Sequence, residues 1–402
     1  MKLLVADKFS EQHLTSLRAL GLEVAYKPEL GAADLPANLA DVAILVVRST
    51  EVTAAAIDAG ETLTLIVRAG AGVNTIDRKA ASRRGIFVAN CPGKNSVAVA
   101  ELTLALLLAI DRRVPEQVAD LRGGKWNKKE YGKADGLLGK TFGVIGFGSI
   151  GREVAARAKA FGMTVVAWSR SLDDATAKAH GVERAASPRA VAERSDIASV
   201  HLALSADTRG LLGEEFFAAL RPGAIFLNTA RAEVVDPAAL DRAVRERGLR
   251  AGVDVHPGEP DTGSGSVAFP LVALPGVYGS HHVGASTRQA ENAIADEAVR
   301  IVRSFLERGE VPNCVNLSRP GGSGATCQLV VRHHDRVGVL ANVLASLRRH
   351  QINVKEMENQ IFDGAAAACA TIRLQSVPPA ECLAEIRGRS DEIIHAELVP
   401  SS

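Results

Sequence analysis

Apolar residues in the first 95 positions form short runs that alternate with stretches rich in alanine and leucine. The β-branched runs lie at positions 2–6, 42–47, 64–67 and 86–89. Strands separated by helices are typical of parallel βαβ units, because a parallel neighbour is reached only through a crossover connection. The pattern therefore predicts a first doubly wound α/β domain with a parallel sheet.

A second series of the same kind runs from Thr141 to about His282. Its strand-like segments lie at positions 142–145, 164–168, 197–202, 224–228 and 252–255. Further helices are predicted over 288–306 and over the apolar stretch 97–110, which contains Glu101 and falls short of the roughly 20 apolar residues that cross a bilayer. The second series predicts another doubly wound parallel sheet.

The C-terminal part of the chain has a different order of elements. A Ser, Pro and Gly-rich stretch predicts a linker over 317–325, and the module 326–402 follows it. Its predicted elements are a strand at 327–331, a helix at 337–349, strands at 352–359 and 366–374, a helix at 379–387 and a strand at 393–398. This βαββαβ order predicts a ferredoxin-like domain.

Composition excludes several classes of partner. The 402 residues are enough for two or three domains, and 47 basic against 46 acidic residues leave a net charge of +1. Such a chain has no field that would concentrate nucleic acid or an anionic membrane. The five cysteines are scattered without metal-ligand spacing, which predicts no metal site and suits a reducing compartment. The opening Met1–Asp7 is too short for a signal-peptide core, so we expect a cytoplasmic protein.

A glycine motif, Gly-Phe-Gly-Ser-Ile-Gly at 146–151, lies between the predicted strand 142–145 and a predicted helix at 152–161. In this context the first glycine allows a tight turn, the second lets the backbone approach a pyrophosphate, and the third lets helix and strand pack closely. The motif predicts a Rossmann-type site for NAD or NADP. Its cofactor-binding residues are Gly146, Gly148, Ser149, Ile150 and Gly151.

The end of the next strand bears on the choice of coenzyme. Where NAD enzymes usually place a carboxylate on the adenosine ribose, this chain has Ser169 and Arg170. A 2′-phosphate would meet no repulsion there, and Arg170 could bind it, which slightly favours NADP. Alternatively, Arg170 lies against the adenine ring and NAD still binds.

Three polar residues near strand ends suit hydride chemistry at a hydroxyl-bearing carbon. Such chemistry needs a proton shuttle with a pKa near neutrality, a cation for the carboxylate, and a group that holds the shuttle. His282, Arg231 and Glu259 are candidates for these roles in the order given. Arg231 lies in the motif N-x-A-R, Glu259 in D-V-x-x-x-E-P and His282 in H-x-G-A-S-T.

These motifs resemble those of the D-isomer-specific 2-hydroxyacid dehydrogenases, and the resemblance covers nearly the whole chain. It is strongest to the phosphoglycerate dehydrogenase branch with a C-terminal ACT domain, which implies oxidation of 3-phosphoglycerate to 3-phosphohydroxypyruvate for serine biosynthesis. It implies that His282 exchanges the C2 hydroxyl proton, that Glu259 pairs with its imidazole, and that Arg231 binds the carboxylate. The family's cofactor contacts further map onto Thr229, Ala230, Asp254, His282 and Gly284, with Asp254 on the nicotinamide carboxamide.

The resemblance also implies a domain plan and a substrate side of the cleft. Residues 1–95 and 284–316 would form a flavodoxin-like substrate-binding domain, 96–283 the Rossmann domain and 326–402 the ACT domain. The substrate-binding positions are Arg48, Arg68, Gly70, Gly72 and Asn95, with backbone N–H groups near the two glycines on the carboxylate. Two arginines exceed what a small unphosphorylated acid requires, which favours a phosphorylated substrate.

Some positions depart from the phosphoglycerate pattern. Val67 replaces a usual Gly, Asn74 a usual Asp, and Ala232 and Glu233 follow Arg231 where small residues are common. Because of these departures, the alternative function is that of an NADPH-dependent glyoxylate or hydroxypyruvate reductase. A non-catalytic cofactor-sensing protein on the same fold is a third hypothesis, against which the retained Arg, Glu and His argue.

The ACT resemblance extends to regulation and assembly. Positions His333, Asp335 and Asn353 match those at which relatives bind serine at a paired interface. Asp335 and Val337 replace residues that family members often have there, so an ACT domain that serves oligomerisation alone is the alternative. In either case a homodimer or homotetramer is expected.

Overall fold

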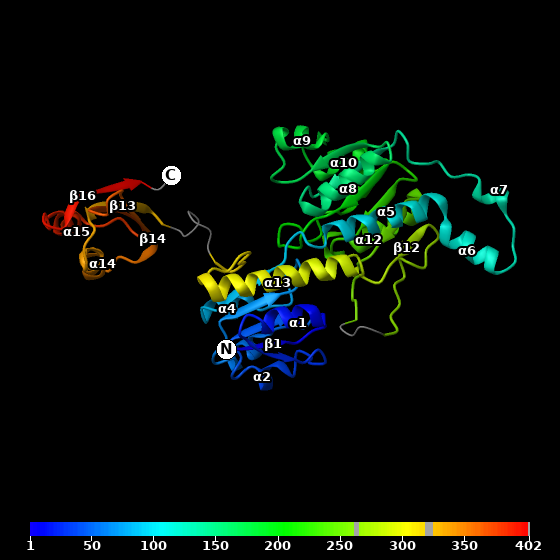
Figure 1. Ribbon diagram of the computed structural model, residues 1–402. Coiled ribbons are helices and arrows are strands. Elements are labelled where there is room, and N and C mark those ends of the chain that lie inside the picture. Colours follow the sequence, from blue (N-terminus) through cyan, green and yellow to red (C-terminus); the bar gives the residue numbers. More distant parts are fainter. Residues whose placement is uncertain (261–264, 318–324, 401–402) are drawn as a thin grey trace. The chain divides into compact units, whose positions relative to one another are not determined.

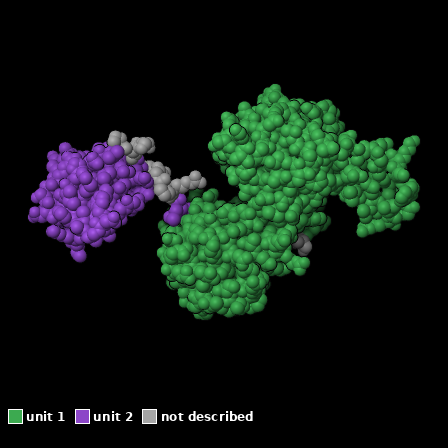
Figure 2. All heavy atoms as spheres, turned by 45° about the horizontal axis from the view of Figure 1, so that its top comes forward, with its two compact units in different colours: residues 1–315 green, residues 316–402 purple. Residues whose placement is uncertain are grey.

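The computed structural model describes residues 1–260, 265–317 and 325–400. The chain divides into two compact units, residues 1–315 and 316–402, coloured separately in Figure 2. The first contains two parallel sheets and the second an antiparallel sheet (Figure 1). The predicted fold class is thereby confirmed. Of the predicted linker, residues 318–324 lie outside the described residues.

The first sheet has the order β2-β1-β3-β4-β5, and all its strands are parallel. Its strands are β1 (Lys2–Val5), β2 (Glu23–Tyr26), β3 (Ile44–Val47), β4 (Leu65–Arg68) and β5 (Phe87–Asn90). Its helices are α1 (Glu11–Arg18), α2 (Leu35–Asn38), α3 (Ala54–Ala59), α4 (Arg78–Arg83) and α13 (Arg288–Arg308). The helices α1 and α13 cover one face and α2, α3 and α4 the other, so each face has its own apolar core.

The apolar pattern predicts four of these five strands and misses β2. The missed strand lies at the edge of the sheet, and its four residues are half-buried or exposed. A parallel strand that is buried on both faces reads as a continuous apolar run, as also at β5 on the other edge, whereas the exposed β2 does not. Burial on both faces is thus the property that the sequence pattern detects.

The second sheet has the order β12-β11-β10-β9-β6-β7-β8 and is also parallel. Its strands are β6 (Thr141–Ile145), β7 (Thr164–Trp168), β8 (Glu183–Arg184), β9 (Ile197–Val200), β10 (Ile225–Asn228), β11 (Arg250–Val253) and β12 (Val277–Gly279). The helices are α5 (Ser96–Arg112), α6 (Val114–Arg122), α7 (Lys128–Tyr131), α8 (Ser149–Ala160), α9 (Asp174–His180), α10 (Pro188–Arg194), α11 (Glu214–Ala219), the 3-10 helix η1 (Ala232–Val234) and α12 (Pro237–Arg247). None of the helices in the described part of the chain is long and apolar enough to cross a membrane.

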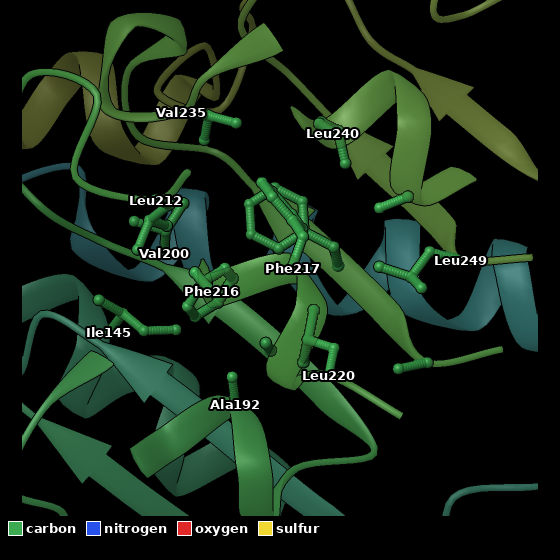
Figure 3. Packing of buried hydrophobic residues seen from close by; sticks show 14 of the residues in the cluster. Ile145, Ala192, Val200, Leu212, Phe216, Phe217, Leu220, Val235, Leu240 and Leu249 are labelled. Atoms are coloured by element: carbon green, nitrogen blue, oxygen red, sulfur yellow. The ribbon is translucent and has the colours of Figure 1, made fainter. Parts of the chain in front are cut away.

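Two apolar cores fix this second sheet. Helices α5, α8 and α9 pack on one face, and α10, α11 and α12 on the other. Figure 3 shows Phe216 and Phe217 of α11 at the centre of the second of these cores. The rings of Phe217 and Phe226 meet edge to face with centroids 5.1 Å apart, a favoured aromatic geometry. The sheet is therefore held rigidly from both sides.

The C-terminal unit is an antiparallel sheet of order β14-β15-β13-β16. Its elements are β13 (Cys327–His334), α14 (Val339–Arg349), β14 (Val354–Ile361), β15 (Ala367–Leu374), α15 (Ala380–Arg387) and β16 (Ile393–Pro400). Both helices bury their apolar sides in one core with the sheet. The observed order of elements is the predicted βαββαβ plan.

Candidate active site

The three predicted catalytic residues all follow strands of the second sheet. Arg231 comes after β10, Glu259 after β11 and His282 after β12, and these three strands are neighbours. The carboxyl ends of parallel strands share one edge of a sheet, which is where open α/β sheets bind ligands. The topology thereby places the three residues at the edge that such sheets use for ligands.

His282 and Glu259 form a direct ion pair. The imidazole Nδ1 donates to Glu259 Oε2 over 2.6 Å, and the second carboxylate oxygen accepts from the backbone N–H of His256 over 2.6 Å. The His282 side chain is 46% exposed, so its other nitrogen, Nε2, is placed to exchange a proton with a bound molecule. The pair has the geometry of a base with its orienting group.

The electrostatics of this pair favour the charged forms. The hydrogen bond to Glu259 raises the pKa of His282, against the opposing effect of partial burial. For Glu259, burial would raise the pKa, but the hydrogen bonds from His282 and His256 outweigh it and the pKa is lowered. The imidazole is therefore a stronger base than a free histidine, as a proton acceptor near neutral pH requires.

Asp254 organises the loop that carries His282. Its carboxylate is 1% exposed and accepts from Ser280 Oγ at 2.6 Å, Val283 N at 2.9 Å and Gly284 N at 2.8 Å. The Asp254 carbonyl also accepts from the His282 N–H. Oδ1 accepts two of these three side-chain bonds and Oδ2 one, so Oδ2 retains a lone pair and the contact with the nicotinamide carboxamide stays a prediction.

His282 has a backbone φ of +51°, in the left-handed region that a residue with a side chain rarely adopts. The bonds around Asp254 hold it there. Strained backbone of this kind persists only where the surroundings fix it, and it gathers at functional sites. The conformation directs the imidazole towards Glu259.

The guanidinium groups of Arg231 and Arg68 lie against Gly72 and Gly70, in the loop that follows β4. A Cβ built on Gly72 would be 2.8 Å from Arg231 Nη2, and one built on Gly70 would overlap the Arg68 guanidinium. At both positions a guanidinium group occupies the space that a side chain would need. Loop and catalytic strand ends are thus in contact.

The positive charges at this place repel one another. Burial lowers the pKa of Arg68, and the nearby charges of Arg231 and Arg48 lower it further. Cations placed within electrostatic range of one another, without a buried carboxylate between them, favour a bound anion. In addition, Arg68 Nε, Asn95 Oδ1 and Ser96 Oγ are buried with no hydrogen-bond partner in the described part of the structure. The site has the charge and the polar groups to bind a carboxylate.

Two of the predicted substrate-binding residues, Gly70 and Arg48, have hydrogen-bond partners within the chain. The Gly70 N–H donates to the Arg68 carbonyl over 2.8 Å, so it is engaged by the chain rather than directed at a ligand. Arg48 forms an ion pair with Glu291 over 2.9 Å, a contact that the sequence does not reveal. The predicted roles of Arg48 and of the backbone near Gly70 and Gly72 in substrate binding stay predictions.

The glycine motif has the geometry that a dinucleotide requires. Gly146 has a φ of +99°, and a Cβ there would be 2.5 Å from the His201 carbonyl oxygen. A Cβ on Gly151 would overlap the Gly146 carbonyl, whereas Gly148, at the N-cap of α8, faces open space. A pyrophosphate could therefore reach the positive N-terminus of α8 at Gly148. The residues fit the cofactor that the motif implies.

The remaining predicted cofactor residues surround this edge. Thr229 Oγ1 is 2.8 Å from Thr103 Oγ1, and the Ala230 N–H donates to Asn228 Oδ1, so the loop after β10 is fixed. At the end of β7, Arg170 pairs with Asp207 over 2.8 Å. Arg170 at the end of β7 is thus paired with a carboxylate from the loop after β9.

The predicted effector residues lie in the C-terminal unit. His333 is 2% exposed, and its ring nitrogens contact the His334 carbonyl and Asn359 Oδ1. Asn353 donates to Gln375 over 3.2 Å. Asn353 is exposed, and so is Asp335, which follows β13 and forms no ion pair with any residue in the described ranges. In the same ranges, no group of three His, Cys, Asp or Glu side chains could hold a metal ion.

Comparison with known proteins agrees with this geometry. Residues 104–284 match the family model "D-isomer specific 2-hydroxyacid dehydrogenase, NAD binding domain". The chain is 38% identical over 320 residues to the D-3-phosphoglycerate dehydrogenase of Methanocaldococcus jannaschii, covering 79% of this chain and 60% of that protein. It is 39% identical over 271 residues to the hydroxypyruvate reductase of Thermotoga maritima, covering 67% of this chain and 86% of the relative.

A solved structure extends the comparison to the fold. The NAD⁺-bound 3-phosphoglycerate dehydrogenase of Entamoeba histolytica superposes with a TM-score of 0.66 at 27% identity, covering 79% of this chain and 99% of the other. The chain spans only about 60% of the length of the archaeal phosphoglycerate dehydrogenases that it matches.

Proposed function

Because the chain belongs to the D-isomer specific 2-hydroxyacid dehydrogenase family, we propose that it is an enzyme that exchanges a hydride between C2 of a D-2-hydroxy acid and a nicotinamide cofactor. The observation that carries the proposal is the His282–Glu259 pair at 2.6 Å beside the guanidinium of Arg231. A base, its orienting carboxylate and a cation are the groups that this reaction needs.

The residues act in the following way during oxidation. Arg231 and Arg68 bind the substrate carboxylate, and Arg231 polarises the C2 oxygen. His282 Nε2 accepts the C2 hydroxyl proton while Glu259 stabilises the resulting imidazolium. A nicotinamide cofactor, held at Gly146, Gly148 and Gly151, would supply the hydride acceptor, so that the hydroxy acid would become a 2-oxo acid with release of one proton.

We propose 3-phosphoglycerate as the substrate and 3-phosphohydroxypyruvate as the product. Arg48 adds a third guanidinium beside Arg68, more positive charge than one carboxylate requires. The similarity to phosphoglycerate dehydrogenases supports this choice. Reduction of hydroxypyruvate or glyoxylate is the second candidate, and the Arg48–Glu291 pair favours it because Glu291 offsets the charge of Arg48.

The test is steady-state kcat/KM with NAD and NADP in parallel. Oxidation of 3-phosphoglycerate is compared with reduction of hydroxypyruvate and of glyoxylate. We expect the phosphorylated acid to be preferred; preference for hydroxypyruvate would establish the second candidate. No turnover of any of the three would leave a cofactor-sensing protein.

A variant of His282 tests the catalytic assignment. We choose His282→Asn, since asparagine tolerates the left-handed backbone of this position better than alanine. Loss of the base should lower kcat about 10²- to 10⁴-fold, with cofactor affinity, measured by fluorescence titration, unchanged. Wild-type turnover in this variant would contradict the assignment.

The assignment of domains follows from the same proposal. Residues 1–95 and 284–316 would bind the substrate, 96–283 the cofactor, and 326–402 would be an ACT domain. An exposed Asp335 is compatible with serine binding there, but His333 is already hydrogen-bonded. Isothermal titration with L-serine tests this, and absence of heat would leave an ACT domain without an amino-acid ligand.

We also propose a homodimer in a cytoplasmic setting. The segment with α6 and α7 extends from the first unit (Figure 1), and nearby Trp126 and Leu138 are 80% and 85% exposed. Large exposed apolar side chains on one segment are typical of an interface. Light scattering should give twice the chain mass, with dissociation in Trp126→Ser. Cys91, Cys327, Cys369 and Cys382 form no disulfide among the described residues, which suits a reducing compartment.

A further inference from the structure

A cavity of about 430 Å³ lies at the carboxyl edge of the first sheet, where strands β1, β2 and β3 meet the N-terminal part of α13. Its polar lining includes Lys8, Ser10, Tyr26, Arg48 and Glu291. Ala69, which follows Arg68, also lines it. The cavity therefore shares Arg48 with the predicted substrate-binding residues and borders the loop that follows β4.

Both the backbone and the guanidinium of Arg48 are hydrogen-bonded to carboxylates at this cavity. The Asp7 carboxylate accepts from the backbone N–H groups of Arg48, Ser49 and Thr50 at 2.6, 3.1 and 3.1 Å, which fixes the loop. The guanidinium donates through Nη1 to Glu291 at 2.9 Å. Because the bond uses a single nitrogen, Nη2 and Nε point elsewhere on the planar group.

The charges around the cavity are mixed. Lys8 is exposed and forms no ion pair with any described residue, so its ammonium is available to an anion. Glu291 is the carboxylate in contact with Arg48, and its side chain is 44% exposed, against 31% for Arg48. An anion that enters the cavity is attracted by Lys8 and Arg48 and repelled by Glu291.

We propose that Glu291 is a specificity-determining residue that weakens the binding of phosphorylated acids at Arg48 relative to unphosphorylated ones. This inference rests on the proposed dehydrogenase function. A phosphate group carries close to two negative charges at neutral pH and would compete with Glu291 for the guanidinium. A hydroxypyruvate or glyoxylate carboxylate, bound at Arg231 and Arg68, has no charged group that reaches Glu291.

The experiment compares Glu291→Gln with the wild type on two substrates. In the variant the KM for 3-phosphoglycerate should fall at unchanged kcat, by only about fivefold because a single exposed charge is removed. The KM for hydroxypyruvate should stay constant. The gain should shrink in high salt. Glu307→Gln, on the exposed last turn of the same helix, is the matched control and should change neither KM. Combined with Arg48→Met, Glu291→Gln should have no effect.

Inhibition by inorganic phosphate separates this inference from the proposed function. If 3-phosphoglycerate is turned over but Glu291→Gln leaves its KM unchanged, the inference is wrong and the function stands. If 3-phosphoglycerate is not a substrate, the proposed substrate is wrong, and the inhibition constant of phosphate against hydroxypyruvate reduction decides the role of Glu291. A lower constant in Glu291→Gln supports that role, and an equal one overturns it.

Discussion

Replacement of Asp254 by asparagine should loosen the loop that carries His282. The buried carboxylate accepts three hydrogen bonds, from Ser280, Val283 and Gly284. An asparagine keeps one acceptor oxygen, so its NH₂ group must face at least one donor, in the best case the Gly284 N–H. One hydrogen bond is lost and one buried donor is left unsatisfied.

The magnitude follows from these losses. A hydrogen bond to a charged acceptor contributes about 1.5–3 kcal/mol, and an unsatisfied buried donor costs about 1–3 kcal/mol. Because the amide can relax, we expect a fall of about 2–4 kcal/mol in the free energy of unfolding of the first unit. A shift of about 1 Å in the imidazole would in addition lower kcat about 10²-fold.

Urea unfolding followed by circular dichroism measures the stability, and steady-state kinetics measures kcat. Ser280→Ala is the matched control, since it removes only the 2.6 Å bond to Oδ1 and should have a smaller effect on both. The reasoning is refuted if Asp254→Asn retains stability and kcat but binds the nicotinamide cofactor more weakly. That result would make Asp254 a cofactor ligand, as the family resemblance implies.

Three further predictions concern charge and protonation. In Glu259→Gln the pKa of His282 should fall, because the carboxylate that raises it is removed. Since oxidation needs a neutral imidazole, the acid limb of the pH profile of kcat/KM should move to lower pH. An acid limb that stays in place would contradict this prediction. In Asp207→Asn the charge of Arg170 is freed, so NADP should bind several-fold more tightly while NAD changes little, as measured by fluorescence titration. Burial raises the pKa of the Cys91 thiol to about 12, so native protein at pH 8 should not be alkylated at Cys91, as peptide mass analysis would show.

In the two parallel sheets the buried strands can be predicted from the sequence, whereas two exposed edge strands cannot. Central strands such as β3 and β9 are buried along their whole length and therefore appear as apolar runs. The edge strands β2 and β8 lack that burial and leave no such pattern. Helices α6 and α7 have no buried residue, so apolar periodicity gives no reason to expect them.

Some residues of the candidate site can likewise be predicted from the sequence, and some of their contacts cannot. Arg231, Glu259 and His282 can be predicted because each lies in a local motif at a strand end, and parallel topology brings strand ends together. The Arg48–Glu291 pair joins residues 243 positions apart through side-chain rotamers, which no local pattern encodes. Other features that only the coordinates reveal are the anchoring by Asp254, the Arg170–Asp207 pair and the engaged Gly70 N–H.

The left-handed backbone at His282 sets stability against activity. A residue with a side chain held at a φ of +51° costs the folded state about 1 kcal/mol or more. Glycine would relieve that strain at position 282 and remove the base at the same time. Selection of variants for heat resistance alone should therefore enrich inactive proteins at this position, whereas selection for turnover retains the strained histidine.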